Sequence, residues 1–368
     1  MVYNLYKEYE INKEIFYLDD NNARKVIILR NILNRLLNNP YIQDREHKLI
    51  DFLLNVTKLN LNSRDISILV KEVLSLDNFP VFNKKDINLD KNIILTGAVG
   101  SGKKGYKTMN ISTPSMLVAA SAGIYTAKPG SKATSSLMGS ADLMRYLGVD
   151  IDISIKDMLK VLKREKFGFF SIESLIPNFD RIYGGYCYSP TILSFILPGL
   201  LTPIKLDSIV YGISHPDVKL SAHCFKHFGF SNGIFVTSTH NYLHYIDEFN
   251  VCGINKIVEI KDGEIMDERL FNPRKELKLP KYKISDLKQG KTIEQNLKYV
   301  LDLFKGNGEK AREDIVALNS AALLYSAKFV SDIKDGFEIS KEIINSGKVF
   351  EKLKRIKKFI HHLPKISK

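Results

Sequence analysis

The sequence contains few cysteines and no long apolar run, and both absences limit the kinds of protein it can encode. Three cysteines in 368 residues are too few and too widely spaced for a disulfide scaffold, so we expect a reducing, cytoplasmic location. The longest apolar stretches, residues 115–125 and 191–204, are too short or too interrupted by proline and glycine to cross a bilayer. Lys7, Glu8 and Glu10 precede any apolar run, which argues against a secretory signal. We expect a soluble protein.

Acidic residues are outnumbered by basic ones, and the formal net charge is +13. A surface of this sign attracts polyanions, whether a phosphorylated small molecule or a nucleic acid. The tail from Lys352 onward is rich in lysine and histidine, and we expect a solvated helix end there, with a nucleic-acid-binding arm as the alternative. The charge by itself does not choose between these partners.

The hydrophobic pattern changes character near residue 90. Before it, apolar residues recur at helical spacing, as in Leu29, Ile32, Leu33 and Leu36, which predicts helices through residues 1–88. After it, short β-like runs alternate with helical stretches, as is typical of an α/β fold. The hydrophobic content of 44% is sufficient for a large core, so we expect one larger domain with a smaller partner.

Glycine and small polar residues are concentrated in residues 100–142, the stretch that carries the most chemistry. The apolar run 93–95 leads into four glycines, Gly97, Gly100, Gly102 and Gly105, which can turn backbone N–H groups toward an anion. Residues 110–113 (NIST) follow, where a helix is predicted to begin and its free N–H groups favour phosphate. A second such cluster occupies residues 128–140. Two phosphate-binding loops one helix apart predict a ligand with phosphates at both ends.

The first loop also fits most of the nucleotide P-loop pattern. Residues 97–104 (GAVGSGKK) match it except at the last position, where Lys104 replaces the Ser or Thr hydroxyl that binds magnesium. Gly105 is then a poor residue to open the required helix. These two departures disfavour a P-loop.

Taken together, these segments resemble the anthranilate phosphoribosyltransferases, whose members carry GTGGDG, NIST, KHGNR, SS and a GSAD-like segment. Here the corresponding residues are GSGKKG (100–105), NIST (110–113), KPGSK (128–132), SS (135–136) and GSAD (139–142), and INSGK (344–348) matches near the end. The resemblance extends from about Lys91 to Arg355. It implies a small all-helical domain in residues 1–90, joined by helices near 175–200. It also implies an α/β domain in residues 91–368 with a mixed, mostly parallel sheet, and a homodimer.

The resemblance also implies which residues bind the co-substrate, phosphoribosyl diphosphate. Asp247 and Glu248 match the acidic pair that holds Mg²⁺ in the family, and Ser112 would supply a hydroxyl near a second Mg²⁺. The residues that would enclose phosphoribosyl diphosphate are Gly100, Ser101, Gly102, Lys103, Lys104, Thr108, Asn110, Ser112, Thr113, Lys128, Gly130, Ser131, Lys132, Ser135, Ser136 and Ser140. No general base is assigned, because the implied dissociative chemistry depends on positioning and on neutralising the leaving diphosphate.

The departures from the family pattern fall where the acceptor binds. Pro129 and Ser131 replace a histidine and an asparagine, and the arginine that pairs with the carboxylate of anthranilate should lie near Gly184. Arg181 could serve in its place if the register shifts by three residues. The predicted function is therefore phosphoribosyl transfer to a nitrogen-bearing aromatic acceptor other than anthranilate. The alternatives are an ordinary anthranilate phosphoribosyltransferase of tryptophan biosynthesis and a catalytically silent relative that binds nucleic acid.

Overall fold

The computed structural model describes residues 25–82, 84–87, 89–90, 92–102, 106–134 and 136–364. Three amphipathic helices come first: α2 (Lys25–Asn38), α3 (Arg45–Thr57) and α4 (Ser63–Ser75). Their apolar faces pack together, and Asn62 caps α4 by accepting hydrogen bonds from the N–H groups of Arg64 and Asp65. The helices predicted from the spacing of leucine and isoleucine are therefore present, although the prediction for residues 1–24 lies outside the described part of the chain.

A single twisted sheet follows, with nine strands among the described residues. Its strand order is β3-β2-β1-β4-β5-β7-β8, with β6 paired to β5 and β9 paired to β7. The neighbours from β3 to β5 run parallel, and β6, β7, β8 and β9 pair antiparallel. This confirms the predicted α/β fold with a mixed, mostly parallel sheet. The strands are β1 (Leu95–Gly100), β2 (Tyr125–Gly130), β3 (Phe167–Ser171), β4 (Ser208–Gly212), β5 (Gly233–Thr239), β6 (Tyr245–Ile246), β7 (Ile254–Lys261), β8 (Glu264–Ile265) and β9 (Arg269–Phe271).

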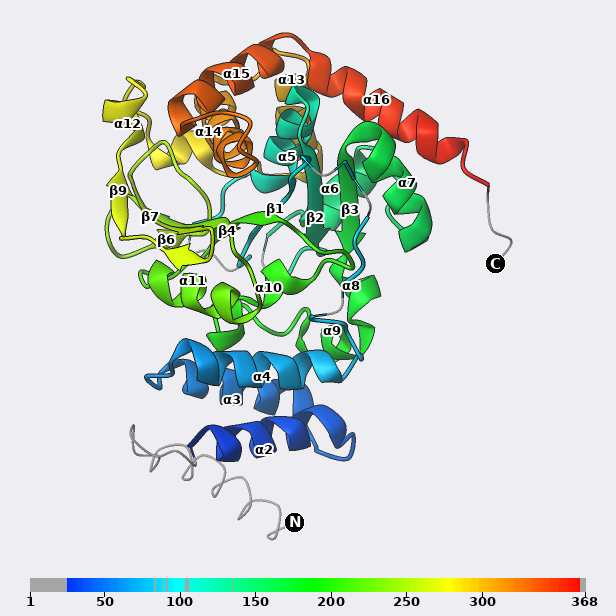
Figure 1. Ribbon diagram of the computed structural model, residues 1–368, viewed down its shortest axis with the longest axis vertical. Coiled ribbons are helices and arrows are strands. Elements are labelled where there is room, and N and C mark those ends of the chain that lie inside the picture. Colours follow the sequence, from blue (N-terminus) through cyan, green and yellow to red (C-terminus); the bar gives the residue numbers. More distant parts are fainter. Residues whose placement is uncertain are drawn as a thin grey trace.

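Helices cover both faces of the sheet, which buries the apolar parallel strands on two sides. On one face α14 contacts β1, β4 and β5, while α10 and α11 lie on the face toward α2, α3 and α4 (Figure 1). The remaining helices are α5 (Ser112–Ala122), α6 (Ser140–Tyr146), α7 (Ile155–Glu165), α8 (Ile172–Leu175), α9 (Pro177–Tyr183), η1 (Ile192–Phe195), α10 (Leu197–Leu200), α11 (Val218–His227), α12 (Pro273–Glu276), η2 (Ile284–Leu287), α13 (Ile293–Phe304), α14 (Lys310–Ser326), α15 (Ile333–Asn345) and α16 (Lys348–His361).

The short helices between residues 172 and 200 join the N-terminal helices to the sheet. In this junction α9 packs on α3, and η1 contacts both α3 and α4. Asp77, just after α4, accepts hydrogen bonds from the N–H groups of Asn178 and Phe179 at 2.8 and 2.9 Å, so it caps the start of α9. The N-terminal helices therefore position a part of the chain that lies far away in the sequence.

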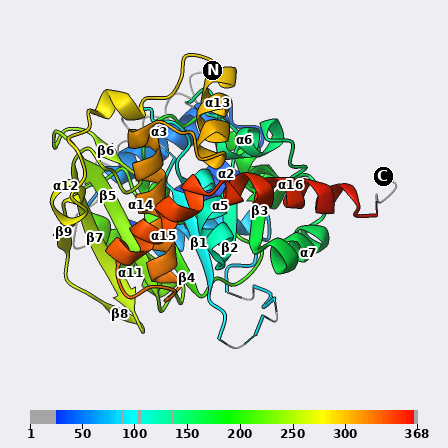
Figure 2. The same cartoon turned by 90° about the horizontal axis from the view of Figure 1, so that it is seen from above.

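The basic C-terminal stretch differs from the expected solvated end. Figure 2 shows α16 beside α5 and α7, both of which it contacts. Along α16, Val349, Leu353 and Ile356 are buried, and the Lys352 ammonium donates to the Glu165 carbonyl at 2.8 Å. An apolar stripe at helical spacing holds this helix against the protein, while its other lysines face solvent. Among the helices that the structure describes, none combines the length and apolar character required to cross a bilayer.

Candidate active site

The carboxyl ends of the parallel strands open into a cleft of ≈ 500 Å³. Strands β1, β2 and β4 end at Gly100, Gly130 and Gly212, on the same edge of the sheet. Parallel strands bring their following loops together at this edge, which is where ligands bind in open α/β sheets. The two glycine-containing loops of the sequence therefore meet across one cleft.

The acidic pair that follows β6 lies against the first loop. The Asp247 carboxylate accepts hydrogen bonds through Oδ2 from the Gly102 N–H at 2.6 Å and from the Ser101 hydroxyl at 3.3 Å. A Cβ atom added at Gly100 would lie 2.8 Å from Asp247 Cγ, and one added at Gly212 would overlap the Asp247 backbone. Both strand ends must therefore be glycine for the carboxylate to sit between them.

Lys128 and Ser112 face each other at the floor of the cleft. Lys128, in β2, is 2% exposed, and its Nζ lies 3.0 Å from Ser112 Oγ, at the first residue of α5. A buried ammonium next to the N-terminus of a helix places two favourable interactions for a phosphate in one spot. Because α5 begins at Ser112 rather than at residue 104, the geometry is also not that of a P-loop, in which the helix starts inside the glycine motif.

Hydrogen bonds within the second loop fix its shape. The Asp142 carboxylate, in the first turn of α6, accepts from the N–H groups of Ala133 and Gly139 at 2.7 and 2.9 Å. The Asn110 side chain donates to the Met138 carbonyl at 3.2 Å, which connects the NIST segment to this loop. These contacts give Asn110 and Asp142 roles in shaping the cleft.

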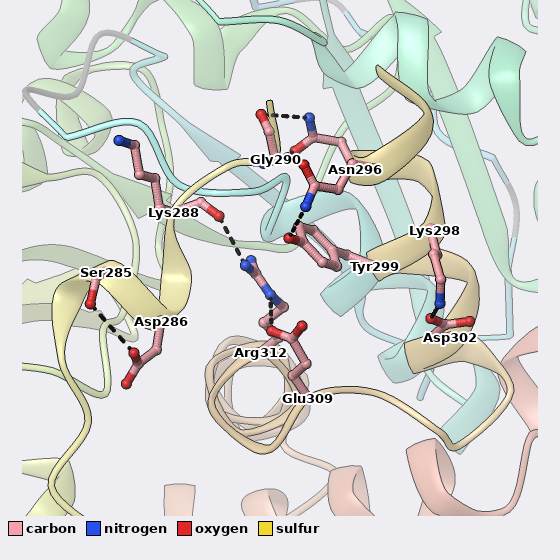
Figure 3. Close-up of polar contacts among 11 residues, drawn as sticks. Ser285, Asp286, Lys288, Gly290, Asn296, Lys298, Tyr299, Asp302, Glu309 and Arg312 are labelled. Atoms are coloured by element: carbon pink, nitrogen blue, oxygen red, sulfur yellow. Dashed lines mark hydrogen bonds and ion pairs between the residues drawn. The ribbon is translucent and has the colours of Figure 1, made fainter. Parts of the chain in front are cut away.

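A third segment, residues 287–289, pairs with the strand-like stretch 107–109 at the mouth of the cleft. Met109 and Gln289 donate their N–H groups to the carbonyls of Leu287 and Lys107, both at 3.1 Å. Lys288, which lies between Leu287 and Gln289, is fixed through its backbone. Arg312 donates through Nη2 to the Lys288 carbonyl at 3.0 Å (Figure 3). We call residues 287–289 the strap.

Arg312 is itself held on three sides. Its guanidinium lies 3.7 Å from the centre of the Tyr299 ring and donates through Nε to Glu309 at 2.7 Å (Figure 3). The side chain is 5% exposed, so it is a buried support rather than a surface cation. Helices α13 and α14 therefore support residues 107–109 through the strap.

Most of the residues that the resemblance implied line this one cleft. They are Gly100, Ser101, Gly102, Thr108, Asn110, Ser112, Lys128, Gly130, Ser131, Lys132, Ser136, Ser140, Asp247 and Glu248. Thr113 does not line it, because its side chain turns into the core and is 1% exposed. Lys103, Lys104 and Ser135 lie outside the described residues.

The other half of the cleft is formed by α8, α9 and α10, where the sequence predicted an acceptor site near Gly184 but not the residues that line it. It is lined by apolar residues such as Ile176, Phe179 and Leu197, and by the carboxylates of Glu173 and Asp180. Burial and the neighbouring Glu173 raise the pKa of Asp180. The sequence signal for this half of the cleft is an acidic residue, Asp180, one helical turn before Gly184.

Arg181 does not substitute for the missing arginine near position 184. It is exposed and does not line the cleft, whereas its neighbour Asp180 does. Successive residues on a helix point about 100° apart, so a charge at 181 cannot reach the place that 180 and 184 share. This half of the cleft is therefore lined by the carboxylates of Glu173 and Asp180, while Arg181 lies outside it.

The cleft also has the ligands that a hard divalent cation prefers. Asp247 Oδ1 is buried and has no hydrogen-bond partner among the described residues, and Glu248 lines the same space. No group of three His, Cys, Asp or Glu side chains gathers in the described part of the chain. Two carboxylates without a third suit Mg²⁺ that shares its coordination with substrate phosphates and water.

Comparison with known proteins places this fold and cleft in one class. The family model described as "Glycosyl transferase family, a/b domain" matches residues 94–350. Among solved structures, anthranilate phosphoribosyltransferase from Thermus thermophilus superposes with a TM-score of 0.74 at 24% identity, covering 95% of this chain and 99% of that one. The Saccharomyces cerevisiae enzyme in complex with PRPP and Mg gives 0.75 at 20% identity, covering 97% and 98%. These likenesses establish the fold.

Sequence relatives narrow the class to a family. The anthranilate phosphoribosyltransferase of Bacillus licheniformis is 30% identical over 261 residues, covering 70% of this chain and 75% of the relative. That of Acetivibrio thermocellus is 31% identical over 263 residues, covering 71% and 74%. The chain belongs to the anthranilate phosphoribosyltransferase family. It is a phosphoribosyltransferase of that type.

Proposed function

We propose that this enzyme transfers the phosphoribosyl group of phosphoribosyl diphosphate to the nitrogen of an aromatic acceptor, with Mg²⁺ as the metal cofactor. The observation that carries the proposal is that Asp247, hydrogen-bonded to the Gly102 N–H, lines the same cleft as Lys128 and Ser112. The yeast relative that shares the fold was solved with PRPP and Mg, which supports the same ligands here. In the reaction the bond from the anomeric carbon to diphosphate breaks, and a bond from that carbon to the acceptor nitrogen forms.

The residues of the chain bind and orient the reactants in this scheme. The Lys128 ammonium and the N-terminus of α5 hold a phosphate, and the backbone of residues 100–102 approaches the diphosphate closely because it carries little side-chain bulk. Asp247 and Glu248, with the Ser112 hydroxyl, would hold Mg²⁺. When bound, the ion supplies positive charge that stabilises the departing diphosphate. Diphosphate leaves and the acceptor nitrogen loses a proton.

We propose further that the preferred acceptor is not anthranilate. Gly184 occupies the position where the family pattern has an arginine, and Arg181 is exposed outside the cleft. A carboxylate transferred from water into a pocket without a paired cation loses hydration that is not replaced. We expect anthranilate to be a poor substrate.

Ordinary anthranilate transfer is the second candidate, and Lys132 is the observation that favours it. The Lys132 side chain lines the cleft near Asp180, and its positive charge acts to lower the pKa of that carboxyl group. The carboxylates of Asp180 and Glu173 outnumber this single cation, so ordinary anthranilate transfer is our second candidate.

Calorimetric titration and fluorescence test the two levels of the proposal. Phosphoribosyl diphosphate with Mg²⁺ should bind, and removing Mg²⁺ should weaken the binding; no heat at millimolar ligand would contradict phosphoribosyl transfer itself. Consumption of anthranilate, followed by its fluorescence, should be slow. Turnover at the level of the Bacillus licheniformis enzyme, assayed in parallel, would support the ordinary acceptor instead.

A further inference from the structure

The acceptor half of the cleft is largely apolar, and the Asp180 carboxylate in it has no hydrogen-bond partner among the described residues. We define the acceptor pocket by Ile176, Phe179, Asp180, Tyr183, Leu197 and Leu201, which come from α9 and α10 and the residues beside them. Apolar pockets of this kind can bind an aromatic ring, and the few polar groups among the lining residues determine which substituents are accepted. The charge of those polar groups therefore decides the class of acceptor.

Asp180 occupies the space that a side chain at position 184 would need. The two residues are one turn apart at the end of α9, where the Gly184 N–H donates to the Asp180 carbonyl at 2.7 Å. A Cβ atom added at Gly184 would lie 2.8 Å from both Asp180 Cγ and the Asp180 backbone oxygen. Position 184 therefore has no room for a side chain as long as the Asp180 carboxylate lies where it does.

The other carboxylates near the acceptor pocket are already engaged. Glu173 accepts from the Lys132 N–H at 2.5 Å and from the Ser171 hydroxyl at 2.6 Å. Asp77 accepts from the N–H groups at the start of α9. For the Asp180 carboxylate no side-chain hydrogen bond or ion pair is found within the described part of the chain. Asp180 is therefore the carboxylate that can accept from a ligand.

The other charged groups around Asp180 keep this pocket unfavourable for an anion. Glu173 and Asp77 act to raise the pKa of Asp180, and Lys132 alone acts to lower it. Among these perturbing groups the two carboxylates outnumber the one ammonium, so the immediate surroundings of Asp180 disfavour a further negative charge. An acceptor with a carboxylate would therefore meet repulsion, whereas an N–H donor would find a half-buried acceptor for its hydrogen bond.

We propose that the natural acceptor is an aromatic amine or nitrogen heterocycle that carries a second N–H donor and no anionic group, and that Asp180 selects it by accepting that hydrogen bond. This inference rests on the proposed phosphoribosyl transfer, since the pocket opens beside the phosphoribosyl diphosphate site. Asp180 is a specificity residue here and takes no part in breaking the bond to diphosphate.

Two isosteric probes test the inference. Anthranilate and 2-aminobenzamide differ only in that a carboxylate becomes an uncharged carboxamide with N–H donors. Each is titrated calorimetrically into the wild-type enzyme, with and without phosphoribosyl diphosphate and Mg²⁺. We expect 2-aminobenzamide to bind at least about tenfold more tightly, the size of effect typical for a hydrogen bond to a charged group.

The variant Asp180→Asn should reduce this preference to less than about threefold, because the neutral amide neither repels the carboxylate nor attracts the carboxamide N–H as strongly. Asp51→Asn, which changes an exposed aspartate on α3, should keep the full preference. Thermal melting of each variant checks that it folds.

The possible results separate this inference from the function on which it rests. Equal binding of the two probes, tighter binding of anthranilate, absence of binding by both, or a preference unchanged in Asp180→Asn would each overturn the role of Asp180. Intact binding of phosphoribosyl diphosphate in those cases would leave the proposed function standing. Failure to bind phosphoribosyl diphosphate would instead contradict the proposed function, and the titrations without it still measure the preference between the probes.

Discussion

Asp247 shows how one carboxylate can serve both the fold and the site. Its Oδ2 is used by the first loop, through Gly102 and Ser101, while its Oδ1 is buried without a partner among the described residues. A buried polar atom without a partner costs free energy unless a ligand or ion completes it. The position of Oδ1 therefore favours a cation in the working enzyme.

The Asp247→Asn variant tests whether Asp247 supplies a charged ligand to a cation. An amide retains the shape but cannot supply a charged ligand, so we expect turnover with Mg²⁺ to fall by at least about 100-fold. Initial rates of diphosphate release, measured across a range of Mg²⁺ concentrations, provide the readout. The matched control Asp267→Asn, at an exposed position, should behave as wild type. A variant that keeps its rate and its Mg²⁺ dependence would disprove the metal role of Asp247.

At the residue scale, the sequence predicted those residues whose chemistry is local. The NIST segment and the glycines of the first loop are short motifs, so their type and spacing can be recognised without coordinates. Asp180 has only the weaker signal of its spacing from Gly184, because its place in the cleft depends on the missing Cβ of Gly184 and on the position of α9. The metal and phosphate roles assigned to individual residues stay predictions.

At the scale of single elements, the strap couples α13 and α14 to residues 107–109. Arg312 in α14 is the connection, through the Lys288 carbonyl and the Tyr299 ring of α13. Replacement by Met keeps much of the apolar contact but removes the hydrogen bonds. We expect the strap to loosen and residues 107–109 to lose their partner.

For Arg312→Met we expect the affinity for phosphoribosyl diphosphate to fall by about tenfold, the order of magnitude for a lost hydrogen bond that positions a binding segment. Isothermal titration measures it. Lys298→Met removes another cation in the same region, one that is 71% exposed and pairs with Asp302, and should leave the affinity unchanged (Figure 3). Equal effects of the two variants would argue against the strap as a support for the loop.

The end of β1 gives a second prediction at this scale. Gly100→Ala places a methyl group 2.8 Å from Asp247 Cγ and 2.9 Å from the Asp247 backbone oxygen, so the acidic pair must move. We expect the stimulation of binding by Mg²⁺ to be lost while the sheet remains folded. The control is Gly168→Ala in β3, where the nearest atom, Leu162 Cβ, is 3.3 Å away and the cleft is remote. The comparison uses titrations with and without Mg²⁺, and circular dichroism to check folding. Normal Mg²⁺ stimulation in Gly100→Ala would show that the close approach is not needed.

At the scale of the whole molecule, Lys84 joins the N-terminal helices to the region of α10. Its ammonium donates to the Leu200 carbonyl at 2.6 Å, and burial lowers its pKa from 10.5 to about 7. The unfolded chain therefore binds more protons than the folded chain between about pH 7 and pH 10.5, so this group makes stability rise with pH across that window.

The Lys84→Met variant removes this titration. We expect the difference in melting temperature, wild type minus variant, to increase from pH 6.5 to pH 9.5, since only the wild type gains stability as Lys84 deprotonates. Differential scanning calorimetry in buffers of equal ionic strength measures it. Lys85→Met, at an exposed neighbouring lysine, should show no such trend. A constant or shrinking difference for Lys84→Met would contradict the lowered pKa.

Much of the overall architecture was predictable, because it depends on patterns that repeat along the chain. Helical spacing gave α2, α3 and α4, and alternating strands and helices gave the mostly parallel sheet. The basic tail was predicted less well, since the burial of Lys352, on the inner side of α16, depends on a distant carbonyl at Glu165. Pairing of residues 107–109 with the strap is equally non-local and leaves no signal in either segment. The expected homodimer and the domain boundary at residue 90 stay predictions.

The strap also has a consequence for how the enzyme is made. During synthesis the ribosome delivers both glycine loops and the acidic pair well before it delivers residues 287–289 and the Arg312 that anchors them. A nascent chain that has completed β1 to β9 therefore still lacks the partner of residues 107–109. Full ligand affinity should therefore be reached only late in translation, once α14 has emerged and Arg312 can hold the strap in place.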